Sequence, residues 1–326
     1  MKSSLKIFSK GLIDYAGLFP PASLDLEAAF RNFLDYSKSD ESEMLGKFIC
    51  PASRLSELTI EIEKYKYKKD SKFQVSVLGT GGKTYDLFFN SLYADIRHIL
   101  EFNKKNPVHF LTSSYEVRIP DEFSDPAHRS RLNELVEFAN FVFGDEIRTE
   151  MNVFFEASPH ADIDLLNLLT ECLQKFNTSA SDALKLRSGI KLRTGGVIAT
   201  AFPESEEIAR VIMMANDKQI PFKATAGLHH PIKKYNDSVS TDMHGFINVF
   251  GAGLLLFGNE LTLEDIINIL NEKHPENFIF TDTHFKWKDF AVSNSTIERA
   301  RENFMISFGS CSFDEPREDL KVLGLM

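Results

Sequence analysis

"GIKLRTGGVIATAFPESEEIARVIMMANDKQIPFKATAGL", residues 189–228, decides the fold class. Its two ends are short β-rich runs, and between them charged residues alternate with Ile, Val, Met and Ala as in an amphipathic helix. A strand, a helix and a second strand in this order form the unit that joins parallel strands. The stretch therefore predicts a parallel sheet whose crossovers are helices.

The same unit recurs along the chain. Five β-rich runs that each precede an amphipathic stretch come before residue 189, at 12–19, 47–52, 73–80, 108–119 and 151–158. After residue 228, the run "FIFTDTHF" at 278–285 precedes a helical stretch at 293–305, and we take it as the eighth strand. Eight units predict an α/β fold of the (β/α)8 TIM barrel type. A doubly wound open sheet is the alternative, and the lack of a complete glycine-rich nucleotide turn before any helix favours the barrel.

The chain is predicted to form a single domain over residues 1–326, since neither a linker-like shift in composition nor a strong internal repeat divides it. Polar residues 232–243 predict a long rim loop, and residues 309–326 predict a C-terminal tail over one end of the barrel. The apolar stretch 245–258 is shorter than the roughly 20 residues that a membrane span needs, so it predicts a buried helix.

Composition narrows the partners and the location. The chain has 47 acidic against 37 basic residues and a net charge of -10, which disfavours binding to nucleic acid. Three widely separated cysteines indicate reduced thiols rather than disulfides, and the N-terminal residues lack the apolar block of a signal peptide. We therefore expect a cytoplasmic protein without membrane contact. The sequence leaves its oligomeric state open, and a homo-oligomer is compatible with it.

Polar residues on three neighbouring predicted strands occupy the positions that face the barrel interior. Each strand has apolar residues at alternate positions, suited to the helix ring, and the residues between them point inward. The inward residues near the carboxyl ends are Glu156, Lys191, Arg193, Lys223 and Thr225. Because barrels of this type hold their functional groups at the carboxyl rim, we predict the site there.

Two interior lysines on adjacent strands predict amine chemistry. Like charges disfavour protonation, so each of Lys191 and Lys223 is expected to lower the pKa of the other. At the ordinary value near 10.4 only about 0.04% of a lysine is free amine at pH 7, and a decrease of about three units costs roughly 4 kcal/mol. A free amine forms a Schiff base with a carbonyl compound. Aldolase or lyase chemistry on a small anionic carbonyl compound is the leading prediction.

The turn after the sixth predicted strand suggests where the anion binds. "RTGG", residues 193–196, combines a guanidinium with backbone N–H groups that glycine leaves open. A tight turn that needs glycine conformations explains the same residues. The predicted substrate-binding residues are Arg193, Thr194, Gly195, Gly196 and Thr225.

Residues 151–228 resemble the later strands of the class I deoxyribose-phosphate aldolase family, through "VFFEAS", "GIKLRTGG" and "FKATAGL". The resemblance implies that Lys191 forms the Schiff base and that Lys223 lowers its pKa. Glu156 or His229 is then expected to transfer protons. As a whole the chain also resembles an uncharacterised bacterial protein family with "DYAGLFPPA", "KLRTGG", "FKATAGLHHP" and "HGFINVF" segments. That likeness implies one shared site and no established activity.

Two other functions fit the same residues. In the first, a metal-assisted lyase or isomerase, Glu156 and the histidines His229, His230 and His244 bind a divalent cation while the lysines hold substrate charge. In the second, the barrel binds a metabolite without converting it. The leading prediction requires neither a metal nor a cofactor.

Overall fold

The computed structural model describes residues 1–65, 72–107, 109–147, 150–157, 161–179 and 186–326. Residue 108, the first of one predicted strand run, and residue 158, the last of another, lie outside the described residues. Within those ranges, no helix combines the length and the apolar character that crossing a membrane requires.

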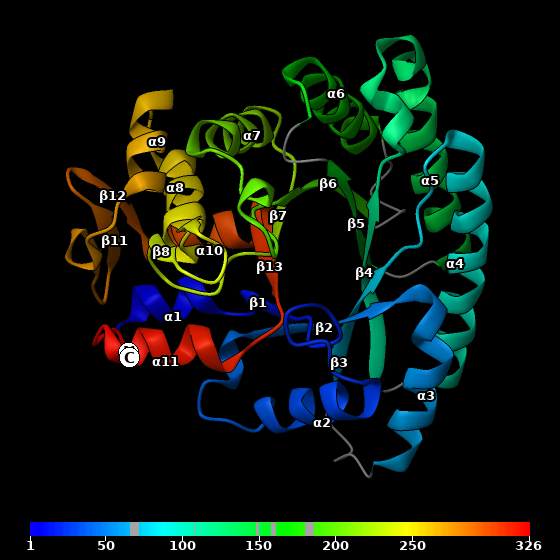
Figure 1. The fold of residues 1–326 in the computed structure, drawn as a ribbon, viewed down its shortest axis with the longest axis horizontal. Helices are drawn as coiled ribbons and strands as arrows, with labels where there is room; N and C mark the ends of the chain where they lie inside the picture. Colours follow the sequence, from blue (N-terminus) through cyan, green and yellow to red (C-terminus); the bar gives the residue numbers. More distant parts are fainter. Residues whose placement is uncertain (66–71, 108, 148–149, 158–160, 180–185) are drawn as a thin grey trace.

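Eight parallel strands close into a barrel, which confirms the predicted (β/α)8 fold (Figure 1). In order around the barrel they are β1 (Ile13–Tyr15), β13 (Met305–Ser310), β7 (Phe222–Thr225), β6 (Leu186–Arg193), β5 (Met151–Ala157), β4 (Phe110–Arg118), β3 (Phe73–Leu78) and β2 (Leu45–Pro51). Closure leaves no free edge, because β13 pairs with both β1 and β7.

Helices form the outer layer of the barrel (Figure 1). They are α1 (Ser3–Ser9), α2 (Leu26–Tyr36), α3 (Leu55–Lys64), α4 (Tyr85–Lys105), α5 (Leu132–Ile147), α6 (Ile163–Ser179), α7 (Ser205–Asp217), α8 (Phe246–Gly258), α9 (Leu263–Asn271), α10 (Asn294–Asn303) and α11 (Asp314–Val322). Local sequence sets several of their starts. Glu204 and Glu207 form a capping box at the start of α7, and Asp25 accepts a hydrogen bond from the main chain of α2.

The eighth strand is not the predicted one. Residues 278–285 form β10 (Phe278–Phe280) and the start of β11 (His284–Trp287), which join β12 (Phe290–Ser293) in a separate antiparallel sheet. This small sheet lies at the periphery, against α8 and α10 (Figure 1). The strand that closes the barrel is β13, whose interior positions Ser307 and Gly309 carry little side chain. Strand propensity marks both segments as extended, but it does not say which sheet a strand joins.

Two other boundaries also differ from the prediction. The rim segment 232–243 is not a plain loop, because β8 (Lys234–Asn236) and β9 (Thr241–Met243) pair in it as an antiparallel hairpin. The predicted tail at 309–326 contains the end of β13 and the whole of α11, so it completes the last β/α unit. Phe313 and Leu320 anchor it in the hydrophobic core. The C-terminal segment is therefore part of the barrel.

The main core lies between the strands and the helices. Ile190, Leu192, Phe222 and Ala224 belong to it, as the alternation of the strands predicted. The predicted buried helix is α8, and its residues from 246 to 256 are all buried. Because these apolar positions face outward, the alternate positions of β6 and β7 must point into the barrel.

Candidate active site

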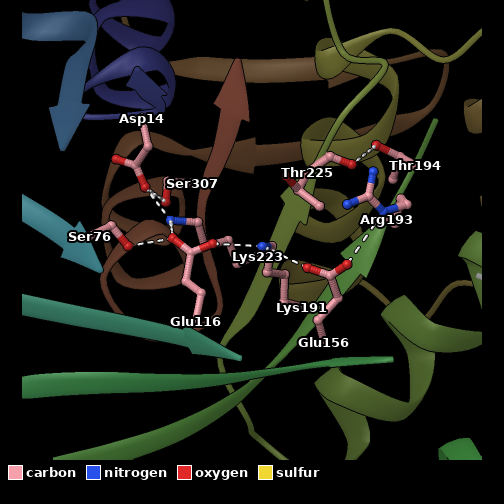
Figure 2. Close-up of polar contacts among 10 residues, drawn as sticks. All are labelled: Asp14, Ser76, Glu116, Glu156, Lys191, Arg193, Thr194, Lys223, Thr225 and Ser307. Atoms are coloured by element: carbon pink, nitrogen blue, oxygen red, sulfur yellow. Dashed lines mark hydrogen bonds and ion pairs between the residues drawn. The ribbon is translucent and has the colours of Figure 1, made fainter. Parts of the chain in front are cut away.

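Neighbouring strands bring polar side chains to one level near the carboxyl end of the barrel (Figure 2). The strand register pairs Glu156 of β5 with Lys191 of β6, and Lys191 with Lys223 of β7. Lys223 in turn pairs with Ser307 of β13. Residues that are adjacent in register and face the same side have side chains close enough to interact. The structure thus brings together the interior Glu156, Lys191 and Lys223 of the sequence analysis.

Lys191 is held between two carboxylates. Its Nζ lies 2.8 Å from Oε2 of Glu116 and 2.7 Å from Oε2 of Glu156, and its side chain is only 4% exposed. Burial by itself lowers the pKa of Lys191, but the attraction of Glu116 and Glu156 outweighs it and raises the pKa above the ordinary range. Lys191 is therefore an ammonium ion in this state of the site.

Lys223 lies deeper and has the same kind of surroundings. Its Nζ contacts Asp14 and lies 2.6 Å from Oε1 of Glu116, and the side chain has no exposure. Burial lowers the pKa of Lys223, whereas Asp14 and Glu116 raise it by more. Asp14 also accepts hydrogen bonds from Ser307 Oγ at 2.7 Å and from the main-chain N of Lys47 at 2.6 Å. These contacts fix Lys223 in its charged form.

The prediction that the two lysines lower each other's pKa is wrong for this state. Figure 2 shows the two amino groups separated by Glu116, so opposite charges alternate from Asp14 through Lys223, Glu116, Lys191 and Glu156 to Arg193. Burial raises the pKa of Glu116, but Lys191 and Lys223 lower it far more, so it stays ionised. The carboxylates decide the charge state because each of them contacts a lysine amino group directly. We call these six residues the ionic chain.

Two residues of the ionic chain were not among the predicted site residues. Glu116 comes from β4, where the outward Tyr115 and Val117 belong to the core and the alternate position faces inward. Asp14 lies between the core residues Ile13 and Tyr15 on the short β1. The alternation that places Lys191 in the interior also places Glu116 there, because Tyr115 and Val117 on either side of it are apolar. For Asp14 the three-residue strand gives too short a pattern.

A cavity of about 280 Å³ opens above the ionic chain. Glu116, Glu156 and Lys191 contribute polar groups to its lining, and the loop after β1 contributes Phe19, Pro20 and Pro21. Among the described residues of this lining, Lys191 is the sole lysine, and Lys223 lies beneath it. A compound in the cavity would therefore meet Lys191 first.

Some of the residues predicted to bind an anion line the cavity, and others join the loops around it. Arg193 lines the cavity with a side chain that is 44% exposed, and its Nε lies 3.4 Å from Oε1 of Glu156. Gly196 and Thr225 also line the cavity. Thr194 is buried, and its hydroxyl donates to the main-chain oxygen of Ala226 at 2.6 Å, so it joins the loops after β6 and β7.

Gly195 allows these two loops to lie in close contact. A Cβ atom on Gly195 would lie 2.8 Å from Cα of Gly227, which itself has a positive φ of 75°. Only glycine allows the two turns to approach so closely. Neither Thr194 nor Gly195 is among the described residues that line the cavity, and both support the contact between the loops. Their contact with substrate stays a prediction.

The three histidines have separate partners. Nδ1 of His229 lies 2.8 Å from Oε2 of Glu315, and Nδ1 of His230 lies 2.6 Å from Oδ2 of Asp319. His244 is buried, with Nε2 at 2.8 Å from the main-chain oxygen of Pro203. In the part of the chain that the structure describes, no three His, Cys, Asp or Glu residues form a group that could hold a metal ion. Glu156 and the histidines thus do not come together in the way that the metal alternative needs.

Comparison with known proteins adds nothing to this geometry: neither a protein family model nor a curated protein matches the chain. The cavity above the ionic chain is accordingly interpreted from its own chemistry. It combines an amine, two carboxylates within hydrogen-bond reach of that amine, and a half-exposed guanidinium. Such a set can bind an anionic compound and move protons to and from it.

Proposed function

We propose that this barrel is an enzyme that acts on a small anionic carbonyl compound, and that Lys191 forms a Schiff base with it in an aldolase or lyase reaction. The observation that carries the proposal is the position of Lys191, which lines the cavity while Glu116 and Glu156 contact its Nζ at 2.8 and 2.7 Å. An amine that attacks a carbonyl must give up protons and later deliver them. Two carboxylates in contact with the amine can accept and return those protons.

The raised pKa of Lys191 sets the first step. Because the resting lysine is an ammonium ion, a proton must pass from Nζ to Glu116 or Glu156 before the amine can attack. A bound compound excludes water from the cavity, and a neutral amine beside a carboxylic acid loses less hydration than an ion pair does. The amine then bonds to the carbonyl carbon, the carboxylic acid gives its proton to the carbonyl oxygen, and water leaves as the imine forms.

Arg193 supports the choice of an anionic compound. Within the described residues the terminal nitrogens of its guanidinium have no hydrogen-bond or ion-pair partner, and its Nε contact with Glu156 is long, at 3.4 Å. A guanidinium binds carboxylate or phosphate through two parallel hydrogen bonds. We infer that Arg193 binds the anionic group while the carbonyl carbon approaches Lys191.

A second function is favoured by the charge state itself. If the ammonium of Lys191 persists, it can hydrogen-bond the carbonyl oxygen while Glu116 or Glu156 removes a proton from the neighbouring carbon. This would be an enolising isomerase or lyase without a covalent intermediate. The raised pKa of Lys191 and the lowered pKa of Glu156 are the observations that favour it.

Reductive trapping separates the two functions. We expect that borohydride, added with 2-oxo acids or with aldehydes of two to six carbons that carry a carboxylate or phosphate group, attaches one compound irreversibly to Lys191, as peptide mass mapping would show. The Lys191→Met variant should lose this adduct. Lys233, a buried lysine outside the cavity, is the internal control and should stay unmodified.

The possible results point to different conclusions. Turnover of a panel compound without any adduct at Lys191 would favour the noncovalent enolising reaction. Binding of a panel compound without turnover or adduct would favour a metabolite-binding barrel. An adduct on Lys223 with none on Lys191 would contradict the assignment of the nucleophile.

A further inference from the structure

Two histidine–carboxylate pairs connect the segment after β7 with helix α11. His229 contacts Glu315 through Nδ1 at 2.8 Å, and His230 contacts Asp319 through Nδ1 at 2.6 Å. The two acids are four residues apart and therefore lie on the same face of α11. Both histidine side chains are 15% exposed. The pairs thus have the same donor and acceptor types and equally exposed histidines, whereas Glu315, at 52%, is more exposed than Asp319, at 31%.

The pairs differ in the cavity that they reach. His229 lines the cavity that also contains Lys191, Glu156 and Arg193. His230 is absent from that lining among the described residues. It lines two outer cavities instead, and His229 and Glu315 also line the one beside the β8–β9 hairpin. Of the two matched pairs, only the first therefore meets a compound bound at Lys191.

The contact with Glu315 determines which nitrogen of His229 is available. A carboxylate accepts hydrogen bonds, so in the neutral imidazole Nδ1 carries the proton and Nε2 keeps its lone pair. Within the described residues Nε2 has no hydrogen-bond partner. The hydrogen bond from His229 is the largest influence on Glu315 and lowers its pKa against the opposing effect of burial, so the carboxylate stays charged opposite the ring. A neutral imidazole in this state accepts a proton at Nε2, and the carboxylate stabilises the resulting imidazolium.

We propose that Glu315 is a positioning residue that holds His229 as the acid–base group of the Lys191 cavity. The proposal rests on the proposed Schiff base. In the imine cation at Lys191, Nε2 of His229 takes a proton from the neighbouring carbon. The electron pair of that C–H bond forms a carbon–carbon double bond, and the electrons of the C=N bond move to nitrogen. The products are a neutral enamine and an imidazolium, and the reverse step returns the proton.

Several charged or titratable groups surround His229. Glu315 and Asp319 come from α11, His230 is the next residue, and Lys234 of β8 lies 3.6 Å from Asp319. Cys311, Arg193, Glu156 and Lys191 share its cavity. Since Glu315 is the one that contacts the ring of His229, its removal should have the largest effect on that ring.

The first measurement reports the tautomer and needs no substrate. In ¹⁵N spectra of histidine-labelled protein, we expect the proton of neutral His229 to lie on Nδ1 in the wild type and in Glu315→Gln, whose amide oxygen still accepts a hydrogen bond. Glu315→Ala should give a mixture of both tautomers. Asp319→Ala, the matched control, should change the spectrum of His230 and leave that of His229 as in the wild type.

The second measurement reports proton transfer. We choose the panel compound that traps at Lys191 and follow exchange of its α-hydrogen for deuterium. His229→Gln should slow exchange by about 100-fold or more, the usual range for a lost acid–base group. Glu315→Ala should slow exchange by about 10-fold or more. Glu315→Gln should have a rate between those of Glu315→Ala and the wild type, because it keeps the tautomer of His229 fixed but lacks the carboxylate charge. His230→Gln and Asp319→Ala should stay within about 2-fold of the wild type.

Each outcome supports or overturns the inference. Equal rates for Glu315→Ala and Asp319→Ala, with normal trapping at Lys191, would overturn it while the Schiff base stands. If no panel compound is trapped at Lys191, the proposed function fails. The role of Glu315 is then tested by the tautomer of His229 alone. In that case a proton on Nε2 of His229 in the wild type, or an unchanged tautomer in Glu315→Ala, would overturn the role of Glu315.

Discussion

Glu116 shows how one residue can set the charge state of a whole site. Its two oxygens contact Lys191 and Lys223 at 2.8 and 2.6 Å, so it holds both lysines in their charged form and separates them. The lysines alone suggested mutual deprotonation, because like charges repel protons. An intervening carboxylate reverses the sign of that effect. The number of lysines in a barrel interior therefore does not by itself predict a free amine.

His244 gives a pH prediction at the same scale. Burial lowers its pKa from the ordinary 6.5 to about 4, and within the described residues Nδ1 has no hydrogen-bond partner. Because the unfolded chain takes up a proton at higher pH than the folded one, His244 contributes its full stability above pH 6.5. This contribution is lost as the pH falls toward 4. Between pH 7 and pH 5 the loss should be about 2 kcal/mol.

The measurement is the free energy of unfolding in urea as a function of pH. His244→Gln keeps a side-chain N–H for the Pro203 carbonyl and has no titrating group. The decrease in its free energy of unfolding between pH 7 and pH 5 should therefore be smaller than that of the wild type by about 2 kcal/mol. His284, an exposed histidine, provides the control through His284→Gln, whose pH dependence should match the wild type. Identical slopes for His244→Gln and the wild type would contradict the buried neutral state.

At the scale of elements, β6 and β7 act as a unit because their carboxyl-terminal loops are joined. The main-chain N of Thr194 donates to Thr225 O at 2.8 Å, and the Thr194 hydroxyl donates to Ala226 O at 2.6 Å. The glycines Gly195 and Gly227 let the loops approach. The residues predicted to bind an anion thus include two that hold the cavity wall in place.

Thr194→Val tests this role. The variant keeps the shape of the side chain and removes its hydroxyl, so the partly buried carbonyl of Ala226 loses this donor. We expect a loss of about 1–3 kcal/mol in the free energy of unfolding, measured by urea denaturation. Thr178→Val removes the hydroxyl of an exposed helical threonine and should change stability by less than about 0.5 kcal/mol. A Thr194→Val effect as small as that of the control would assign the loop contact to the main chain alone.

The elements also show where sequence patterns reach their limit. Strands β2 to β7 were predicted in place, because each has alternating or continuous apolar residues next to an amphipathic helix. β13 was missed and the peripheral β10–β11 was chosen instead. The interior positions of β13 are Ser307 and Gly309, so it lacks the long charged inward residues that marked β6 and β7. A strand with small interior residues can be assigned to the barrel only from the strands that pair with it. Those pairings are set by the closed barrel and not by the local sequence.

For the whole molecule, the buried ionic chain is expected to reduce stability. Transfer of ions from water to the interior costs several kcal/mol each, and buried pairs recover this only in part. Glu116→Gln should be strongly destabilising, by about 3–5 kcal/mol, because it leaves two buried ammonium groups with one carboxylate fewer. A combined replacement that removes charges of both signs should behave differently.

The variant with Asp14→Leu, Glu116→Leu, Lys191→Met and Lys223→Met removes two positive and two negative charges. We expect its free energy of unfolding to equal or exceed that of the wild type, while trapping by borohydride is lost. Urea denaturation of this variant beside Glu116→Gln is the measurement. A combined variant less stable than Glu116→Gln would mean that the ionic chain stabilises the fold.

Periodicity in the amino-acid sequence is enough to predict the fold class and the inward positions of Lys191, Lys223 and Glu156. Both predictions work because the alternation of side chains along a strand is fixed by local backbone geometry. Which strand closes the barrel, and that Glu116 and Asp14 join the lysines, depends on the folded chain. The tertiary structure also shows that α11 carries a carboxylate to His229. The contact between Asp14 and Lys223 joins residues 209 positions apart, and the charge state of the site depends on distances that no local pattern contains.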